Sequence, residues 1–142
     1  MKKQIDIIVA LKRIAADNDG VLLPEEVVAS ARPVSSPLHS RFEWCNSKAA
    51  HEYRLWQARH LIRVCVETIP QSNKPCEVFV SLTPDRVRED GGYRVQTEVL
   101  SDKDLRAQLL ADAFADLDLI RLKYSRLQEL AGVFAAIRKI KR

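Results

Sequence analysis

The chain has 142 residues, a mass of 16.2 kDa and a formal net charge of +4. Hydrophobic residues make up 46% and charged residues 30%, which excludes a fully disordered chain and suits a single domain over residues 1–142. Four glycines and six prolines are too few for a collagen-like or linker sequence. The longest hydrophobic run, residues 133–137, is far shorter than the roughly 20 residues that span a bilayer, so we expect no membrane contact.

The cysteines and the N-terminal residues favour a reducing compartment. Cys45, Cys65 and Cys76 are odd in number and form no C-x-x-C pair, so we expect free thiols in a cytoplasm. Two lysines followed by Asp6 make a poor secretory signal.

The three histidines give little support to a metal site. In a helix over residues 46–69, His51 and His60 would lie on opposite sides, so no metal ion or other cofactor is expected. A nucleophilic pair of Cys45 with His39 stays open as an alternative to a buried, inert thiol.

Three helices are predicted in the first part of the chain, residues 1–69. Apolar spacings of three and four residues predict a helix over 3–17, and Pro24 with two following glutamates opens a second helix that ends near Ala31. A loop follows over residues 33–44. The third helix, 46–69, has an apolar arc so wide that we expect it at the centre of the core. This arc consists of Ala50, Tyr53, Leu55, Ala58, Leu61, Ile62, Val64, Cys65 and Val66.

One β-hairpin is predicted in the middle segment, residues 76–100. Residues 77–82 and 93–99 read as strands, and the second alternates apolar and polar positions. A charged connection over residues 84–92 ends in two glycines. Because a lone hairpin is marginally stable, it must pack on the helices or pair with another chain.

A long helix with a heptad seam is predicted over the last segment, residues 101–142. The seam residues recur at alternating intervals of three and four: Leu110, Ala113, Leu117, Ile120, Tyr124, Leu127, Ala131 and Phe134. A continuous helix to Ile140 would be about 60 Å long, so it must project, pack on a partner, or break at Gly132 or at Tyr124-Ser125. Further apolar residues beside the seam also allow packing within one chain.

Two sets of basic residues are candidates for nucleic-acid binding, one on the third helix and one at the C-terminus. The residues are Lys48, Arg59, Arg63, Arg138, Lys139, Lys141 and Arg142. Gln57 and Arg54 flank the first set, as in a helix that reads the major groove, but Glu52 and Glu67 share that face and favour a solvated surface instead. The basic tail can equally complement a helix C-terminus.

The candidates for partner binding are one tryptophan and the seam. Trp56 lies among charged residues, where a large aromatic side chain is either an anchor for a partner or a lid over the edge of the core, and we favour the partner contact. The predicted partner-binding residues are Trp56, Leu110, Leu117, Ile120, Tyr124, Leu127 and Phe134. No phosphate-binding, dinucleotide-binding or H-E-x-x-H motif occurs, so no catalytic residue is predicted.

Several stretches resemble a family of small phage- and prophage-encoded proteins of unknown function. They are SPLHSRFEW, AAHEYRLWQAR, VFVSL and GGYR, followed by the LLADAFADL and KYSRLQELAGVFAAI segments. Cys45 departs from this family's pattern, in which an acidic residue is commoner. The resemblance implies a bacterial host cytoplasm and an accessory role such as DNA handling, transcription control or assembly.

These observations predict an α+β, mostly α, non-enzymatic phage accessory protein. We expect a homo-oligomer that contacts DNA or a nucleoprotein. The alternative is an assembly or adaptor module that binds a phage or host protein and no nucleic acid.

Overall fold

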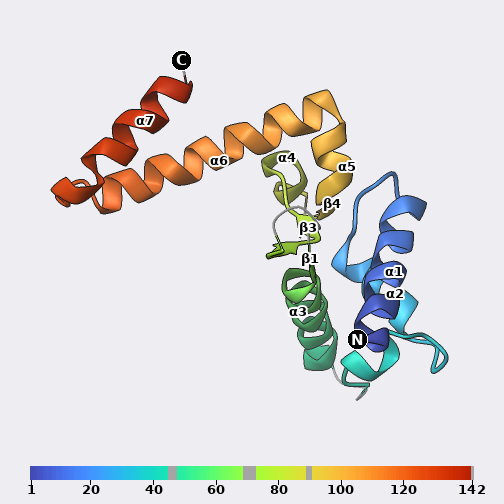
Figure 1. The fold of residues 1–142 in the computed structure, drawn as a ribbon. Helices are drawn as coiled ribbons and strands as arrows, with labels where there is room; N and C mark the ends of the chain where they lie inside the picture. The colour runs from blue at the N-terminus through green and yellow to red at the C-terminus, as the bar shows by residue number, and fades with distance from the viewer. Residues whose placement is uncertain (45–47, 69–72, 89–90, 142) are drawn as a thin grey trace. The chain divides into compact units, whose positions relative to one another are not determined.

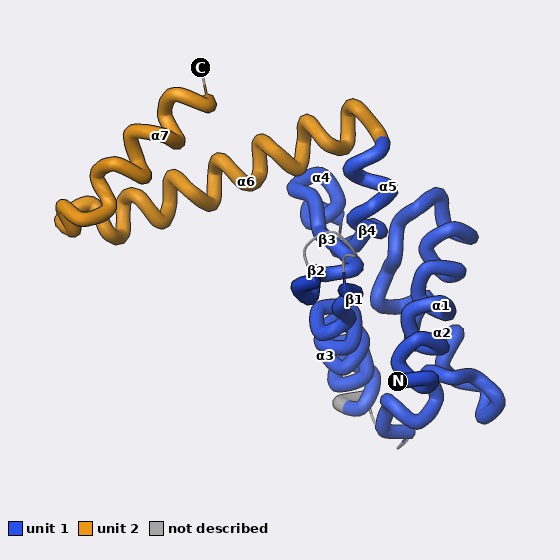
Figure 2. Tube along the Cα trace, viewed as in Figure 1, with its two compact units in different colours: residues 1–101 blue, residues 102–142 orange. Residues whose placement is uncertain are grey.

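The computed structural model describes residues 1–44, 48–68, 73–88 and 91–141. The chain forms two compact units, residues 1–101 and residues 102–142 (Figures 1 and 2). The boundary between them falls at the start of the predicted C-terminal helical segment. Helices dominate and the strands are short, which confirms the α+β, mostly α class.

The three predicted N-terminal helices are present in the first unit. They are α1 (Lys2–Asp17), α2 (Pro24–Ala31) and α3 (Lys48–Val64), and a short 3-10 helix, His39–Arg41, lies in the predicted loop. Pro24 occupies the start of α2, where its missing N–H costs nothing.

The core of the first unit is built from all three helices and from the segments that connect them. Its fully buried large side chains include Leu11 of α1, Val27 and Val28 of α2, and Ile62 of α3. Leu38 joins this core from the loop before the 3-10 helix, with no exposed surface.

The apolar arc of α3 is narrower than predicted. Tyr53 and Val64, which we placed in the arc, are each 50% exposed, whereas the predicted flanking residue Arg54 is only 6% exposed. Arg54 Nη1 donates a hydrogen bond to the Glu43 carbonyl oxygen at 3.2 Å, and its guanidinium lies 5.6 Å from the Trp44 ring centre. This stacking and hydrogen bonding let the arginine be buried, which residue type alone does not indicate.

The third helix is also shorter than predicted, and it is followed by a β-hairpin that the sequence did not predict. Strand β1 (Val66–Thr68) pairs antiparallel with β2 (Pro75–Glu77). The Val78 amide donates a hydrogen bond to the Cys65 carbonyl at 3.2 Å. This bond extends the contact between the two strands by one position, toward the end of α3. The β-branched residues of β1 favour this extended backbone over another helical turn.

The predicted hairpin is present but much shorter than expected. Strand β3 (Phe79–Val80) pairs with β4 (Arg94–Val95), and a helix α5 (Gln96–Ser101) replaces the rest of the predicted second strand. The reason lies in the register: residues 96–99 would face residues 75–78, and residues 75–77 already pair with β1 as strand β2. Helix α4 (Thr83–Arg86) begins soon after β3 and limits the ladder at its other end.

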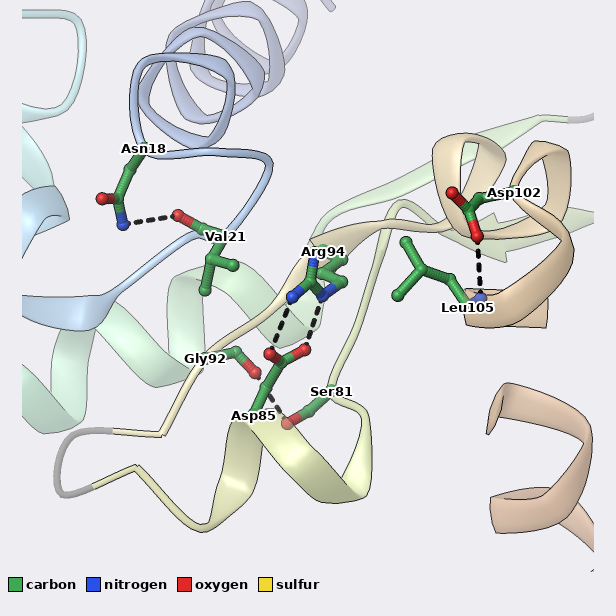
Figure 3. A network of polar contacts seen from close by, with 8 residues as sticks. All are labelled: Asn18, Val21, Ser81, Asp85, Gly92, Arg94, Asp102 and Leu105. Carbon is green, nitrogen blue, oxygen red and sulfur yellow. Dashed lines mark hydrogen bonds and ion pairs between the residues drawn. The ribbon is translucent and has the colours of Figure 1, made fainter. Parts of the chain in front are cut away.

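A buried ion pair fixes the connection between β3 and β4. Asp85 of α4 accepts two hydrogen bonds from Arg94, at 2.7 Å from Nε and 3.0 Å from Nη2 (Figure 3). The Asp85 and Arg94 side chains are 4% and 18% exposed. Ser81 Oγ donates to the Gly92 carbonyl at 2.7 Å in the same network.

The second unit is a helical hairpin rather than one continuous helix. Helix α6 (Lys103–Lys123) is the predicted long helix, a 3-10 turn (Gln128–Leu130) follows, and α7 (Ala131–Lys141) completes the unit. Asp102 caps α6, because its carboxylate accepts from the amides of the second and third following residues. The helix ends with Tyr124 as its C-cap, so the break anticipated at Tyr124-Ser125 is confirmed, whereas Gly132 lies within α7.

Candidate functional site: binding faces of α3 and α6

The exposed side of α3 carries three aromatic rings stacked in a row, which we term the aromatic ladder. The Tyr53 and Trp56 ring centres lie 5.7 Å apart at an interplanar angle of 11°, and those of Trp56 and His60 lie 5.5 Å apart at 7°. Spacings of three and four residues place these side chains on one helical face. Trp56 is 52% exposed and His60 is also exposed, so the ladder is open to solvent.

The two predicted basic residues Arg59 and Arg63 lie beside the ladder on α3. Arg59 is half-buried and Arg63 exposed, and Arg63 Nε donates to the Arg59 carbonyl at 3.4 Å. Glu52 is exposed on the same helix. Glu67, predicted to share this face, lies instead in β1 and pairs with Lys12 at 2.8 Å. The Lys48 side chain lies outside the described residues.

Helix α6 displays the first part of the predicted seam on its surface. Leu110 is 55%, Ile120 46% and Tyr124 39% exposed; Ala113 is exposed too, and Leu117 is half-buried. We term these five residues the α6 seam. It extends over about 21 Å of helix. No residue of α6 is buried, so this helix forms no closed core with α7 alone.

The remaining predicted partner-binding residues divide between the turn and the inside of the hairpin. Leu127 lies in the turn after α6 and is 48% exposed. Phe134 is only 8% exposed, so the prediction that it contacts a partner is wrong. Helix α6 ends at Lys123, and the turn after it directs α7 back along α6. Phe134 then lines a pocket of the second unit together with Arg121, Leu127 and Ala131.

The basic tail serves a contact within the hairpin. Lys141 Nζ lies 2.7 Å from Asp118 Oδ2 of α6, and Arg138 and Lys139 are exposed on α7. All three lie in the last turn of α7, where positive charge also suits the helix dipole. Arg142 lies outside the described residues.

We predict that the Lys141 contact is visible as a lowered pKa at Asp118. The hydrogen bond from Lys141 holds the Asp118 pKa below its ordinary value of 3.8, and Arg121 acts in the same direction. The contribution of this contact to the stability of the hairpin is therefore fully present above pH 3.8. It is lost as the pH falls through the lowered pKa of Asp118. An NMR titration of the Asp118 carboxyl measures it.

The matched pair of variants for this titration is Lys141→Met and Lys139→Met. Both remove one charge from the same helical turn, but only Lys141 donates to Asp118. We expect Lys141→Met to raise the Asp118 pKa toward 3.8 and Lys139→Met to move it much less. Equal shifts in the two variants would contradict a specific contact.

Of the histidine and cysteine side chains that could act in catalysis, His39 is held in structural contacts and Cys65 is buried. His39 Nδ1 lies 2.9 Å from the Ala31 carbonyl oxygen, and its ring stacks on Trp44 at 5.1 Å. Burial raises the pKa of the Cys65 thiol, which disfavours the reactive thiolate. Cys45 lies outside the described residues.

Neither a metal cluster nor a membrane-spanning helix is found in the described part of the chain. Within residues 1–44, 48–68, 73–88 and 91–141, no three His, Cys, Asp or Glu side chains gather as metal ligands. In the same ranges, no helix combines the length and apolar character needed to cross a bilayer.

Comparisons with known proteins returned no relatives. No protein-family model matches the chain, no curated protein matches it, and no solved structure resembles it.

Proposed function

We propose that this chain is a self-associating, non-enzymatic accessory protein of a phage or prophage that contacts nucleic acid or a nucleoprotein in the bacterial cytoplasm. The observation that carries the proposal is the α6 seam, in which Leu110, Ile120 and Tyr124 are each more than a third exposed. A second copy presents the same heptad face, so the two seams can pair symmetrically and cover each other as a short coiled coil.

The nucleic-acid contact is supported by charge on α3. Arg59 and Arg63 lie on the same exposed side as the aromatic ladder, and guanidinium groups bind phosphate oxygens well. Arg138 and Lys139 of α7 add exposed positive charge in the second unit. Phosphate contacts of this kind give affinity without sequence specificity.

A protein adaptor is the second candidate function. It is favoured by the exposure of Trp56 and Tyr53, since aromatic side chains dominate many protein interfaces. The Lys141–Asp118 contact also favours it, because it uses one of the predicted DNA-binding charges within the chain. Binding that ignores salt concentration separates this candidate from nucleic-acid contact.

The test of self-association replaces two seam residues with charges. We expect the wild-type protein to show a multiple of 16.2 kDa by light scattering, and Leu117→Lys with Ile120→Lys to give a folded particle of 16.2 kDa. Charged side chains at a paired apolar seam are costly to desolvate, whereas Ile120 is 46% exposed in a single chain. Circular dichroism verifies that the variant retains its helices.

The control uses the same chemistry on another face of the same helix. Leu119 and Leu122 are 65% and 63% exposed and lie away from the seam, so their replacement by lysine should leave the oligomer intact. A wild-type particle of 16.2 kDa at high micromolar concentration would overturn self-association.

A further inference from the structure

The aromatic ladder is a surface with a chemistry that the basic residues alone do not explain. Each neighbouring pair of its rings is parallel within 11° along one side of α3. Every ring also carries a polar atom, the hydroxyl of Tyr53, the indole nitrogen of Trp56 and the imidazole nitrogens of His60. Tyr53 and His60 form the two ends, and each stacks on Trp56 alone among the described residues. Tyr53 is 50% exposed and His60 is also exposed, so solvent reaches both end rings.

We propose that the ladder binds single-stranded nucleic acid by stacking unpaired bases on these aromatic rings. Bases have a flat π-surface that extends a row of parallel rings, and stacking of this kind tolerates any sequence. The inference rests on the proposed nucleic-acid contact. It adds that the exposed face of α3 binds single-stranded rather than double-stranded nucleic acid.

The charges around the ladder fit the phosphates of such a strand. Arg63 is exposed and Arg59 half-buried on the side of α3 that carries Trp56. Glu52 is one opposing charge on this part of the helix. Basic side chains beside aromatic rings are the usual combination for single-strand binding.

Duplex DNA fits this face less well. A helix that reads the major groove needs polar side chains at its centre that reach base edges, and α3 has Trp56 there, with Tyr53 next to it. Bases in a duplex are stacked on each other, so their faces are closed to the ladder.

The experiment measures binding of the full chain to an oligothymidine of about 15 nucleotides and to a duplex of equal length by fluorescence anisotropy. We expect the single strand to bind more tightly than the duplex. Trp56→Ala should weaken single-strand binding about tenfold or more, since it removes the central ring. Because Trp56 is 52% exposed, the variant should fold, and circular dichroism verifies this.

Two further variants test whether the effect of Trp56→Ala is specific to the ladder and how much positive charge contributes to binding. Val34→Ala removes an apolar side chain that is 83% exposed elsewhere in the first unit, so it should leave binding unchanged. Arg63→Gln should weaken binding and lower the salt slope by about one phosphate contact.

The outcomes distinguish the inference from the proposed function. Equal or tighter binding of the duplex, with no effect of Trp56→Ala, would overturn single-strand stacking and leave nucleic-acid contact in place. Binding of neither probe would overturn both, and would leave the ladder as a contact for a protein partner. Single-strand binding that Trp56→Ala weakens and Val34→Ala does not would support the inference.

Discussion

Leu11→Ala is expected to lower the free energy of unfolding of the first unit by about 3 kcal/mol. Leu11 lies in the middle of α1 with no exposed surface, in the same core cluster as residues of α2 and α3. Truncation removes buried methyl groups and leaves a cavity, because the surrounding helices relax only in part. Urea denaturation followed by circular dichroism measures the change.

Ile5→Ala is the matched control for this variant. Ile5 is an aliphatic residue on the same helix but is 55% exposed, so its truncation should cost less than about 1 kcal/mol. A similar loss in the two variants would show that α1 packs by a different face from the one described.

Asp85→Ala is expected to cost about 2–4 kcal/mol of unfolding free energy. The change removes both hydrogen bonds that Asp85 accepts from Arg94, in a place where the carboxylate is 4% exposed. It also removes a contact between β4 and α4, the helix that lies within the β3–β4 connection. Chemical denaturation of the full chain measures the loss.

A double-mutant cycle with Arg94→Met separates the ion pair from the rest of the site. If the pair couples the two residues, the double variant should lose less than the sum of the two single losses. Additive losses would mean that Asp85 stabilises α4 independently of Arg94. Asp6→Ala, at an exposed position of α1, is the control for loss of a carboxylate and should change stability little.

Local sequence signals mark where two of the helices begin. Pro24 marks the start of α2, and Asp102 marks the start of α6, because each acts on backbone groups of its own helix turn. The strands were predicted less well, since β4 can extend past Val95 only along the residues that precede Phe79, and three of these pair with β1 instead. The end of α3 and the β1–β2 hairpin were missed for the same reason: pairing between two segments decides them, and neither segment shows that pairing by itself.

The candidate site was partly predictable. The spacing of Tyr53, Trp56 and His60 was a readable signal for the ladder, but Tyr53 was assigned to the core because of its apolar ring. The contact between Lys141 and Asp118 was beyond sequence reasoning, since it requires the helix to break between them. The burial of Phe134 depends on the same break.

The break after α6 also limits the affinity with which two copies of the chain can bind each other. A seam of five positions offers little more than two heptads, whereas stable coiled coils usually have three or four. Pairing through it would be governed by mass action, with single chains at low copy number and paired chains once the protein accumulates. Each pair would carry two α3 faces, so a strand long enough to reach both would be retained by avidity only after that threshold is passed.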